Sequence, residues 1–126
     1  MSGSASAQNT TAEIQRVFAL QQAHQWDVKA STAAQRKAKL AKLKAAVEAH
    51  ADAIVAAVLE DTRKPEVEIR TTEVMGIIGN IQRNIDNLES WMEPNEVTPS
   101  MNPADRAQII PEARGVCLIL GPWNFP

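Results

Sequence analysis

The sequence predicts a mainly helical chain that ends in a short pair of strands. Apolar residues recur at helical spacing through most of residues 10–93, and this period disappears after Pro94, where prolines interrupt the chain. A continuous apolar run over residues 116–120, bounded by glycines, has the pattern of a strand buried on both faces of a parallel sheet. We therefore divide the chain into a disordered N-terminus (1–9), an N-terminal helical region (10–93), a linker loop (94–105) and strands that enter a further domain (106–126).

Composition and charge exclude several classes of protein. The 126 residues allow one small domain, and the net charge of −2 with intermixed acids and bases argues against a nucleic-acid partner. No apolar run approaches the roughly 20 residues that a membrane helix needs, and the N-terminus shows no secretory signal. A single cysteine rules out an internal disulfide framework and fits a reducing compartment. We expect a cytoplasmic protein without a membrane partner.

A first helix is predicted from Thr10 or Thr11 to about residues 25–28. Thr10 and Glu13 have the spacing of a capping box, in which each side chain binds the other's free backbone N–H. Apolar residues on one face of this helix are Ile14, Val17 and Phe18. His24 has no cysteine or second histidine at ligand spacing, so we assign it a structural or solvent-exposed role and expect no metal site.

A second helical block is predicted over residues 33–61, with a kink or break near residues 50–52. Thr32 and Gln35 fit a capping box at its start. Helical spacing is kept by its apolar residues Leu40, Leu43, Val47, Ile54, Val58 and Leu59. We interpret its basic run as a solvated face rather than a phosphate-binding face, because acidic residues follow it. The run consists of Arg36, Lys37, Lys39, Lys42 and Lys44.

A third helix is predicted from about Pro65, which suits the first helical position, to about Met92. Its apolar residues recur mostly at steps of three and four: Val67, Val74, Ile77, Ile78, Ile81, Ile85, Leu88 and Met92. Gly76 and Gly79 weaken the helix and predict a close approach by another backbone.

The C-terminal stretch is predicted to form a strand at residues 106–111, a turn at residues 112–115 and a second strand at residues 116–120. Gly-Pro then breaks that strand, and Trp-Asn-Phe-Pro follows at its carboxyl end. Ligands of open α/β sheets bind at the carboxyl ends of strands. A parallel strand needs a crossover connection and a second strand. The chain therefore has the pattern of the front end of something longer.

The motifs in these stretches resemble one protein family. Residues 115–126, Gly-Val-Cys-Leu-Ile-Leu-Gly-Pro-Trp-Asn-Phe-Pro, closely resemble the Pro-Trp-Asn-Phe/Tyr-Pro segment of the NAD(P)-dependent aldehyde dehydrogenases. The helices are similar to the class 3 branch of that family, through the motifs Asp61-x-x-Lys64-x-Glu66, Glu73-Val74 and Leu88-x-x-Trp91. That branch often has Ala-Trp-Asn-Tyr where this chain has Pro-Trp-Asn-Phe, so the substrate stays open. The resemblance covers residues 15–126 and implies that the parent protein is α/β and that this chain is its N-terminal portion.

The resemblance implies an oxidoreductase that oxidises an aldehyde to a carboxylic acid with NAD or NADP, through a cysteine thiohemiacetal. By the match, Asn124 is the oxyanion-hole amide, and the residues along the cofactor are Leu120, Gly121, Pro122 and Trp123. Cys117 is not the nucleophile, because a thiol within an apolar strand is inert. The family's nucleophilic cysteine and base glutamate lie beyond this chain, so we expect the isolated chain to be inactive. The full-length enzyme is expected to be a homodimer that acts on a small aldehyde.

Two other functions stay open at this point. The chain can be a stand-alone helical module whose apolar faces dock a partner, or a non-catalytic remnant that associates with dehydrogenase subunits. Without the resemblance, Asn124 is simply a turn residue between prolines. The observation that separates these alternatives is whether the reading frame continues to a cysteine and a glutamate in family context.

Overall fold

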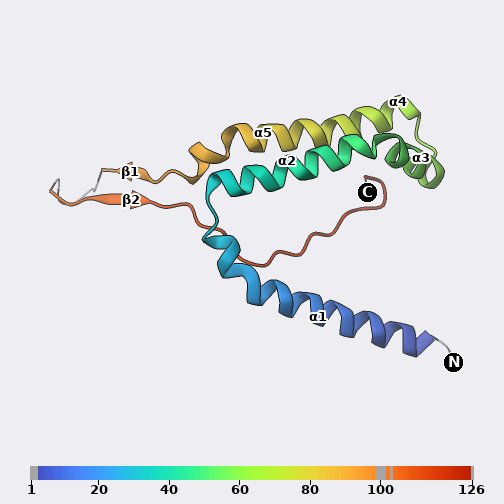
Figure 1. The fold of residues 1–126 in the computed structure, drawn as a ribbon, viewed down its shortest axis with the longest axis horizontal. Helices are drawn as coiled ribbons and strands as arrows, with labels where there is room; N and C mark the ends of the chain where they lie inside the picture. Colours follow the sequence, from blue (N-terminus) through green and yellow to red (C-terminus); the bar gives the residue numbers. More distant parts are fainter. Residues whose placement is uncertain (1–2, 99–101, 103, 126) are drawn as a thin grey trace. The chain divides into compact units, whose positions relative to one another are not determined.

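The computed structural model describes residues 3–98, 102 and 104–125, with side chains described from Thr10 onward (Figure 1). The chain divides into two compact units. The first unit comprises Met1–Ser31 and Glu112–Ile119, and the second comprises Thr32–Pro111 and Leu120–Pro126. Most described residues are helical, as the sequence predicts.

The first unit contains helix α1, Gly3–Lys29. The predicted start at Thr10 or Thr11 is wrong, because the helix already runs through residues 3–9, a segment predicted to be disordered; residues 1–2 lie outside the described part. Alanines in that segment favour a continuing helix. Glu13 therefore caps no terminus, and its carboxylate instead accepts hydrogen bonds from Arg16 at 2.6 and 2.7 Å.

The segment Glu112–Ile119 belongs to the same unit as α1. Lys29 Nζ binds Glu112 Oε2 at 3.0 Å. Gly115 has φ +102°, and a Cβ added there would lie 2.8 Å from Gln25 Oε1. Glycine adopts this positive φ without strain, whereas a residue with a Cβ would be strained there.

The second unit begins with helices α2, Ala33–Ala49, and α3, Ala51–Thr62. The predicted capping box is confirmed: Gln35 N–H donates to Thr32 Oγ1 at 3.2 Å, and Thr32 N–H donates to Gln35 Oε1 at 2.9 Å. The predicted break is confirmed at His50, which ends α2 and precedes α3.

The third predicted helix is a run of three segments: α4, Glu66–Ile69; the π-helix η1, Arg70–Met75; and α5, Gly76–Met92. Pro65 lies just before its first residue, at the N-cap position. The predicted close approach of another backbone to the glycines is wrong. In the described part of the chain, a Cβ at Gly76 would meet the Thr71 carbonyl of the same helix at 3.4 Å, and one at Gly79 would meet no atom of another segment within 4 Å. The Gly76 N–H instead donates to Thr71 O, a bond typical of the π-helix.

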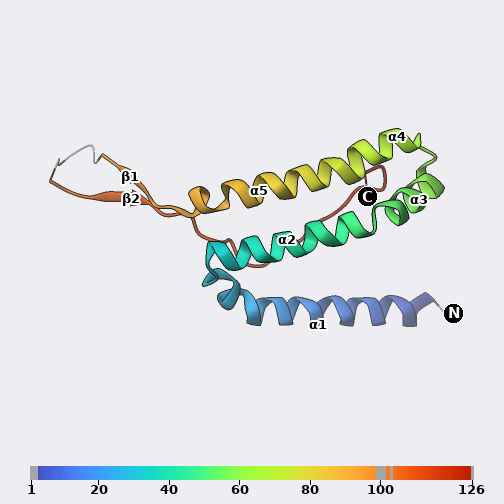
Figure 2. The ribbon, with the colours of Figure 1, turned by 45° about the horizontal axis from the view of Figure 1, so that its top comes forward.

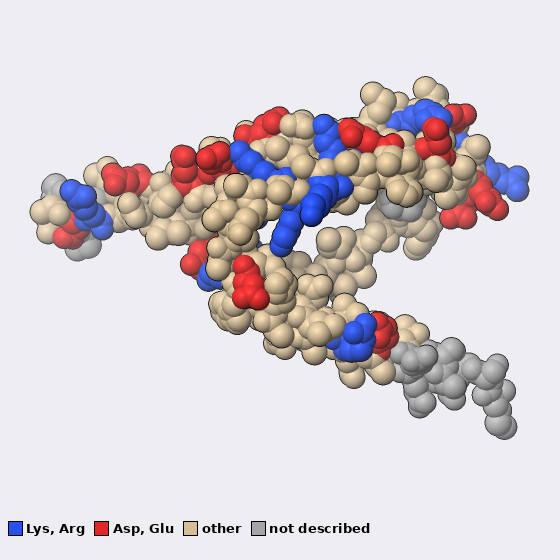
Figure 3. Space-filling model, in the orientation of Figure 1, with Lys and Arg blue, Asp and Glu red and all other residues tan. Residues whose placement is uncertain are grey.

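Helices α2 and α5 run side by side in both ribbon views (Figures 1 and 2). The buried hydrophobic residues of this unit are Val55, Val58, Ile69 and Val74, which pack together, and Ile81 in α5. Lys37 Nζ reaches Glu89 Oε2 at 2.9 Å, and Lys44 Nζ reaches Gln82 Oε1 at 2.8 Å. Part of the basic run thus joins α2 to α5, and charges of both signs intermingle over these helices (Figure 3).

Two short strands follow, β1, Asn95–Val97, and β2, Ala107–Ile109, paired antiparallel with Glu96 opposite Gln108. The strand at residues 106–111 is confirmed by β2, but its partner lies in the predicted linker loop, which is therefore partly wrong. The strand predicted at residues 116–120 is also wrong: no described residue pairs with it. Leu118 and Ile119 are 85% and 89% exposed. An apolar strand of this kind needs partners on both edges and cover on both faces.

Candidate functional site

The residues assigned to the cofactor and to the reaction lie in one short segment of the second unit, Leu120–Pro126. Its chain reverses at a turn over Trp123 and Asn124. The turn is closed by the Phe125 N–H, which donates to the Pro122 carbonyl at 3.3 Å. Trp123 and Asn124 are thus the two central residues of the turn, and asparagine is a residue type that favours turns.

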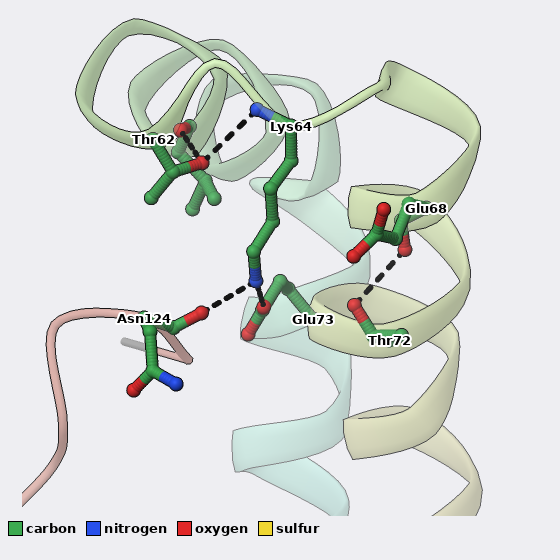
Figure 4. Close-up of polar contacts among 7 residues, drawn as sticks. Thr62, Lys64, Glu68, Thr72, Glu73 and Asn124 are labelled. Carbon is green, nitrogen blue, oxygen red and sulfur yellow. Dashed lines mark hydrogen bonds and ion pairs between the residues drawn. The ribbon is translucent and has the colours of Figure 1, made fainter.

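Lys64 is the residue that holds this turn against the helices (Figure 4). Its Nζ donates to Glu73 Oε1 at 3.0 Å and to the backbone carbonyl of Asn124. The same ammonium lies 3.8 Å from the centroid of the Phe125 ring, a cation–π contact. A residue between α3 and α4 thus binds a segment sixty positions further along the chain.

The Lys64–Glu73 ion pair is largely buried. Glu73 lies in the π-helix η1, and the side chains of Lys64 and Glu73 are 16% and 6% exposed. Within the described residues, no buried side-chain nitrogen or oxygen lacks a hydrogen-bond partner. Removing one member of such a pair leaves the other as an uncompensated charge in a poorly hydrated place.

Local contacts fix the backbone of Lys64, which lies between α3 and α4. Arg63 has φ 56° and ψ 23°, the left-handed conformation that often ends a helix. Thr62 Oγ1 accepts the Lys64 N–H at 3.3 Å and donates its own proton to the Val58 carbonyl at 2.7 Å. These contacts fix the backbone from which the lysine side chain extends.

The carboxamide of Asn124 points away from Lys64, while the backbone carbonyl of the same residue faces the ammonium (Figure 4). Asn124 is exposed. Its side-chain N–H groups are therefore exposed on a turn whose backbone is bound by Lys64 on the opposite side. A neutral amide donor in a fixed turn has the chemistry needed to stabilise a developing oxyanion.

The proposed cofactor residues line an open surface. Leu120 and Trp123 are 83% and 90% exposed. A Cβ added to Gly121 would find no atom within 4 Å, so its backbone can be approached closely. These residues therefore present apolar side chains and an accessible glycine backbone to solvent.

Cys117 lies in the other unit, in the segment Glu112–Ile119. The prediction that it is buried within a strand is wrong, because it is exposed and no strand forms there. The prediction that it is not the nucleophile stays a prediction.

The first unit also contains an apolar cleft of about 470 Å³. One wall is α1, with Ile14, Val17 and Phe18, and the other is formed by residues 116–118. The carboxylate of Glu13, at its edge, is bound to Arg16, whose hydrogen bond lowers the pKa of Glu13. The cleft thus offers apolar surface for packing rather than converging polar groups for chemistry.

Lys64 and Glu73 belong to the motifs singled out in the sequence, but spacing alone assigned them no role. The available signal was an acidic residue at position 73, directly before Val74 and four residues from Ile69 and Ile77. No cluster of three or more potential metal ligands occurs among the described residues. None of the helices that the structure describes has the length and apolar character to cross a membrane.

Comparisons with known proteins agree with the motifs. The sequence model of the "Aldehyde dehydrogenase family" matches residues 4–126. The chain is 45% identical to "Putative aldehyde dehydrogenase AldX" of Bacillus subtilis, over 90% of this chain and 26% of that protein. It is 33% identical to "Aldehyde dehydrogenase family 3 member H1" of Arabidopsis thaliana, over 98% of this chain and 24% of that protein. The chain thus spans about a quarter of the length of these relatives. No solved structure gives a significant match.

Proposed function

Because the chain belongs to the aldehyde dehydrogenase family, we propose that it is the N-terminal part of an oxidoreductase that oxidises aldehydes to carboxylic acids with NAD or NADP. The observation that carries this proposal is the family match over residues 4–126, which includes the Pro-Trp-Asn-Phe turn. The proposal extends to a cytoplasmic homodimer acting on a small aldehyde through a cysteine thiohemiacetal. The family resemblance supports the homodimer and the reaction, and the single cysteine supports a reducing compartment.

Asn124 is proposed as the donor that stabilises negative charge during the reaction. When a cysteine thiolate adds to the aldehyde carbonyl, the carbonyl oxygen becomes an alkoxide, and a fixed amide N–H can bind it without rearranging. The residues proposed to bind the cofactor, at and beside this turn, are Leu120, Gly121, Pro122 and Trp123. The bound nicotinamide supplies the hydride acceptor.

We expect Asn124→Ala to lower kcat of the active enzyme by roughly 10²–10³, with cofactor binding little changed. The lost hydrogen bond is made to charge that exists only in the transition state and the thiohemiacetal, so kcat and kcat/KM should fall together. Steady-state kinetics with aldehyde and cofactor varied independently measure both.

Trp123→Ala is the matched comparison, since it changes the neighbouring residue of the same turn. It removes 90%-exposed aromatic surface proposed to contact the cofactor, so the KM for the cofactor should rise first. If Asn124→Ala left kcat intact and raised only that KM, the oxyanion assignment would be wrong and Asn124 would be a turn residue.

We also expect the isolated 126-residue chain to lack dehydrogenase activity, because the family's nucleophile and base are proposed to lie elsewhere in the enzyme. NAD(P)H formation from an aldehyde is measured by absorbance against a blank without protein. Steady formation above that blank would contradict the proposal that the nucleophile and the base lie elsewhere in the enzyme.

The two alternative functions are a helical interaction module and a non-catalytic remnant. Both predict that a longer enzyme containing this chain does not exist or does not need Asn124.

A further inference from the structure

We infer that Lys64, anchored by Glu73, is a positioning residue that fixes the turn from which Asn124 acts. This inference rests on the proposed function for its catalytic consequence, and on the geometry of the turn for the rest. Lys64 does not reach the reacting atoms in this proposal. It acts through the backbone of Asn124.

The lysine ammonium joins two parts of the second unit that are far apart in the sequence. An ammonium has three N–H donors and no acceptor. One donor binds Glu73 Oε1 at 3.0 Å, another binds the Asn124 carbonyl, and the positive charge lies 3.8 Å from the centre of the Phe125 ring. The ammonium is thus held by one helix and by two successive residues of the turn.

The Lys64–Glu73 ion pair is more buried than an ordinary surface ion pair, whereas the hydrogen bond from Lys64 to Asn124 is exposed. With 16% and 6% of their side chains exposed, Lys64 and Glu73 are poorly screened by water and salt. Lys64 is also restrained at its backbone by Thr62 Oγ1. For comparison, Glu89 in the exposed pair with Lys37 is 71% exposed.

The carbonyl that Lys64 binds and the carboxamide that we propose for catalysis belong to the same residue. Because Lys64 fixes the carbonyl of Asn124, it fixes the direction in which the Asn124 side chain leaves the backbone (Figure 4). Among the described residues, the other backbone hydrogen bond of the turn runs from the Phe125 N–H to the Pro122 carbonyl. A donor displaced by about 1 Å from the reacting oxygen is expected to lose on the order of 10² in rate.

The test is the kinetics of Lys64→Met and Lys64→Arg in the active enzyme. Methionine keeps an apolar stem of similar length and removes the donors and the charge, so kcat should fall by roughly 10 to 100-fold with little change in either KM. Arginine keeps a cation with several donors, so most of the turnover should return. Lys37→Met is the matched control, since it breaks a lysine–glutamate pair of the same unit that does not contact the turn, and its kcat should stay unchanged.

A second variant covers the case in which Lys64→Met does not fold, which far-ultraviolet circular dichroism detects. Phe125→Leu keeps an apolar side chain, leaves the Lys64–Glu73 pair intact and removes only the ring that faces the ammonium. A smaller fall in kcat in the same direction supports the inference. Unchanged turnover in both Phe125→Leu and a folded Lys64→Met variant would overturn it.

The double variant Lys64→Met with Asn124→Ala shows whether the lysine acts through the asparagine. If it does, Lys64→Met should have little further effect once the carboxamide is gone. An equal fold-loss in both backgrounds would mean that Lys64 acts on catalysis by another route, and the inference would be wrong.

A readout without catalysis separates this inference from the proposed function. Amide hydrogen exchange at Phe125, whose N–H closes the turn, should be faster in Lys64→Met than in the parent chain or in Lys37→Met. Faster exchange together with an inert Asn124→Ala change would reject the oxyanion role and keep the positioning role. Unchanged exchange would reject the positioning role itself.

Discussion

At the scale of the single residue, Arg63 is the one described non-glycine residue with a positive φ. It ends α3 in the left-handed conformation, with its N–H donating to the Leu59 carbonyl. An L-residue with a Cβ is strained there by roughly 1–2 kcal/mol, whereas glycine is not. The chain tolerates this strain one position before Lys64. The left-handed conformation of Arg63 determines where the backbone of Lys64 lies.

We expect Arg63→Gly to stabilise the chain by about 0.5–1 kcal/mol, because relief of the left-handed strain exceeds the entropy that glycine adds to the unfolded state. The measurement is the free energy of unfolding from urea titration at low protein concentration. Arg63→Ala is the control, since it removes the same charge and keeps the Cβ, and it should give no gain. Equal stabilisation by both variants would show that the charge rather than the conformation matters.

At the scale of the element, α2 and α5 are joined by the Lys37–Glu89 ion pair, with 2.9 Å between Nζ and Oε2. The hydrogen bond from Lys37, and then its charge, hold the pKa of Glu89 below its ordinary value of 4.5. A carboxylate whose pKa is lower in the folded state than in the unfolded state contributes stability above its unfolded pKa. That contribution is lost as the pH falls through the folded pKa.

The stability difference between the parent chain and Lys37→Met should therefore be present at neutral pH and shrink as the pH is lowered below about 4.5. Thermal unfolding followed by circular dichroism at a series of pH values measures this difference. The stability difference between the parent chain and Glu89→Gln should shrink over the same pH range. A difference that stays constant at every pH would assign the role of Lys37 to packing of its aliphatic stem.

At the scale of the whole molecule, a large amount of apolar side-chain surface is exposed. Leu118, Ile119, Leu120 and Trp123 are each more than four-fifths exposed. Leu118 and Ile119 belong to the first unit, and Leu120 and Trp123 to the second. Large apolar side chains exposed to this degree are typical of surfaces that another part of a protein covers, or of surfaces that associate. The run that was predicted to be a buried strand is therefore unpaired and uncovered in the described part of the chain.

We expect the isolated chain to self-associate with rising concentration, and Ile119→Lys to reduce this association. Lysine places a charge in the middle of the apolar run, where a charged side chain opposes edge-to-edge pairing. Static light scattering over a concentration series measures the apparent mass. Gln22→Lys is the control, since it adds a charge on an exposed polar position and should leave the association unchanged. A parent chain that stays monomeric at high concentration would contradict the expectation.

The sequence by itself determined where the helices of the second unit lie and where they begin, break and end. The capping box at Thr32, the break at His50 and the end at Met92 depend on interactions within a few residues, which spacing records directly. It also determined the family, because the Pro-Trp-Asn-Phe turn is a contiguous motif. The start of α1 was missed, since a polar, alanine-containing segment fits both a loop and a helix.

Only the tertiary structure decided which segments pair and what holds the turn. A strand exists through hydrogen bonds to a neighbour, so the apolar pattern at residues 116–120 indicates a tendency to be buried but identifies no partner. By contrast, β1 lies in the region predicted as a linker and pairs with β2. In the same way, the sequence presents Lys64, Glu73 and Asn124 as separate motifs. Their meeting depends on α3, α4 and η1 bringing one ammonium within reach of a carboxylate and of a carbonyl distant in the chain. Contacts between residues far apart in sequence leave no periodicity along the chain, which is why spacing cannot reveal them.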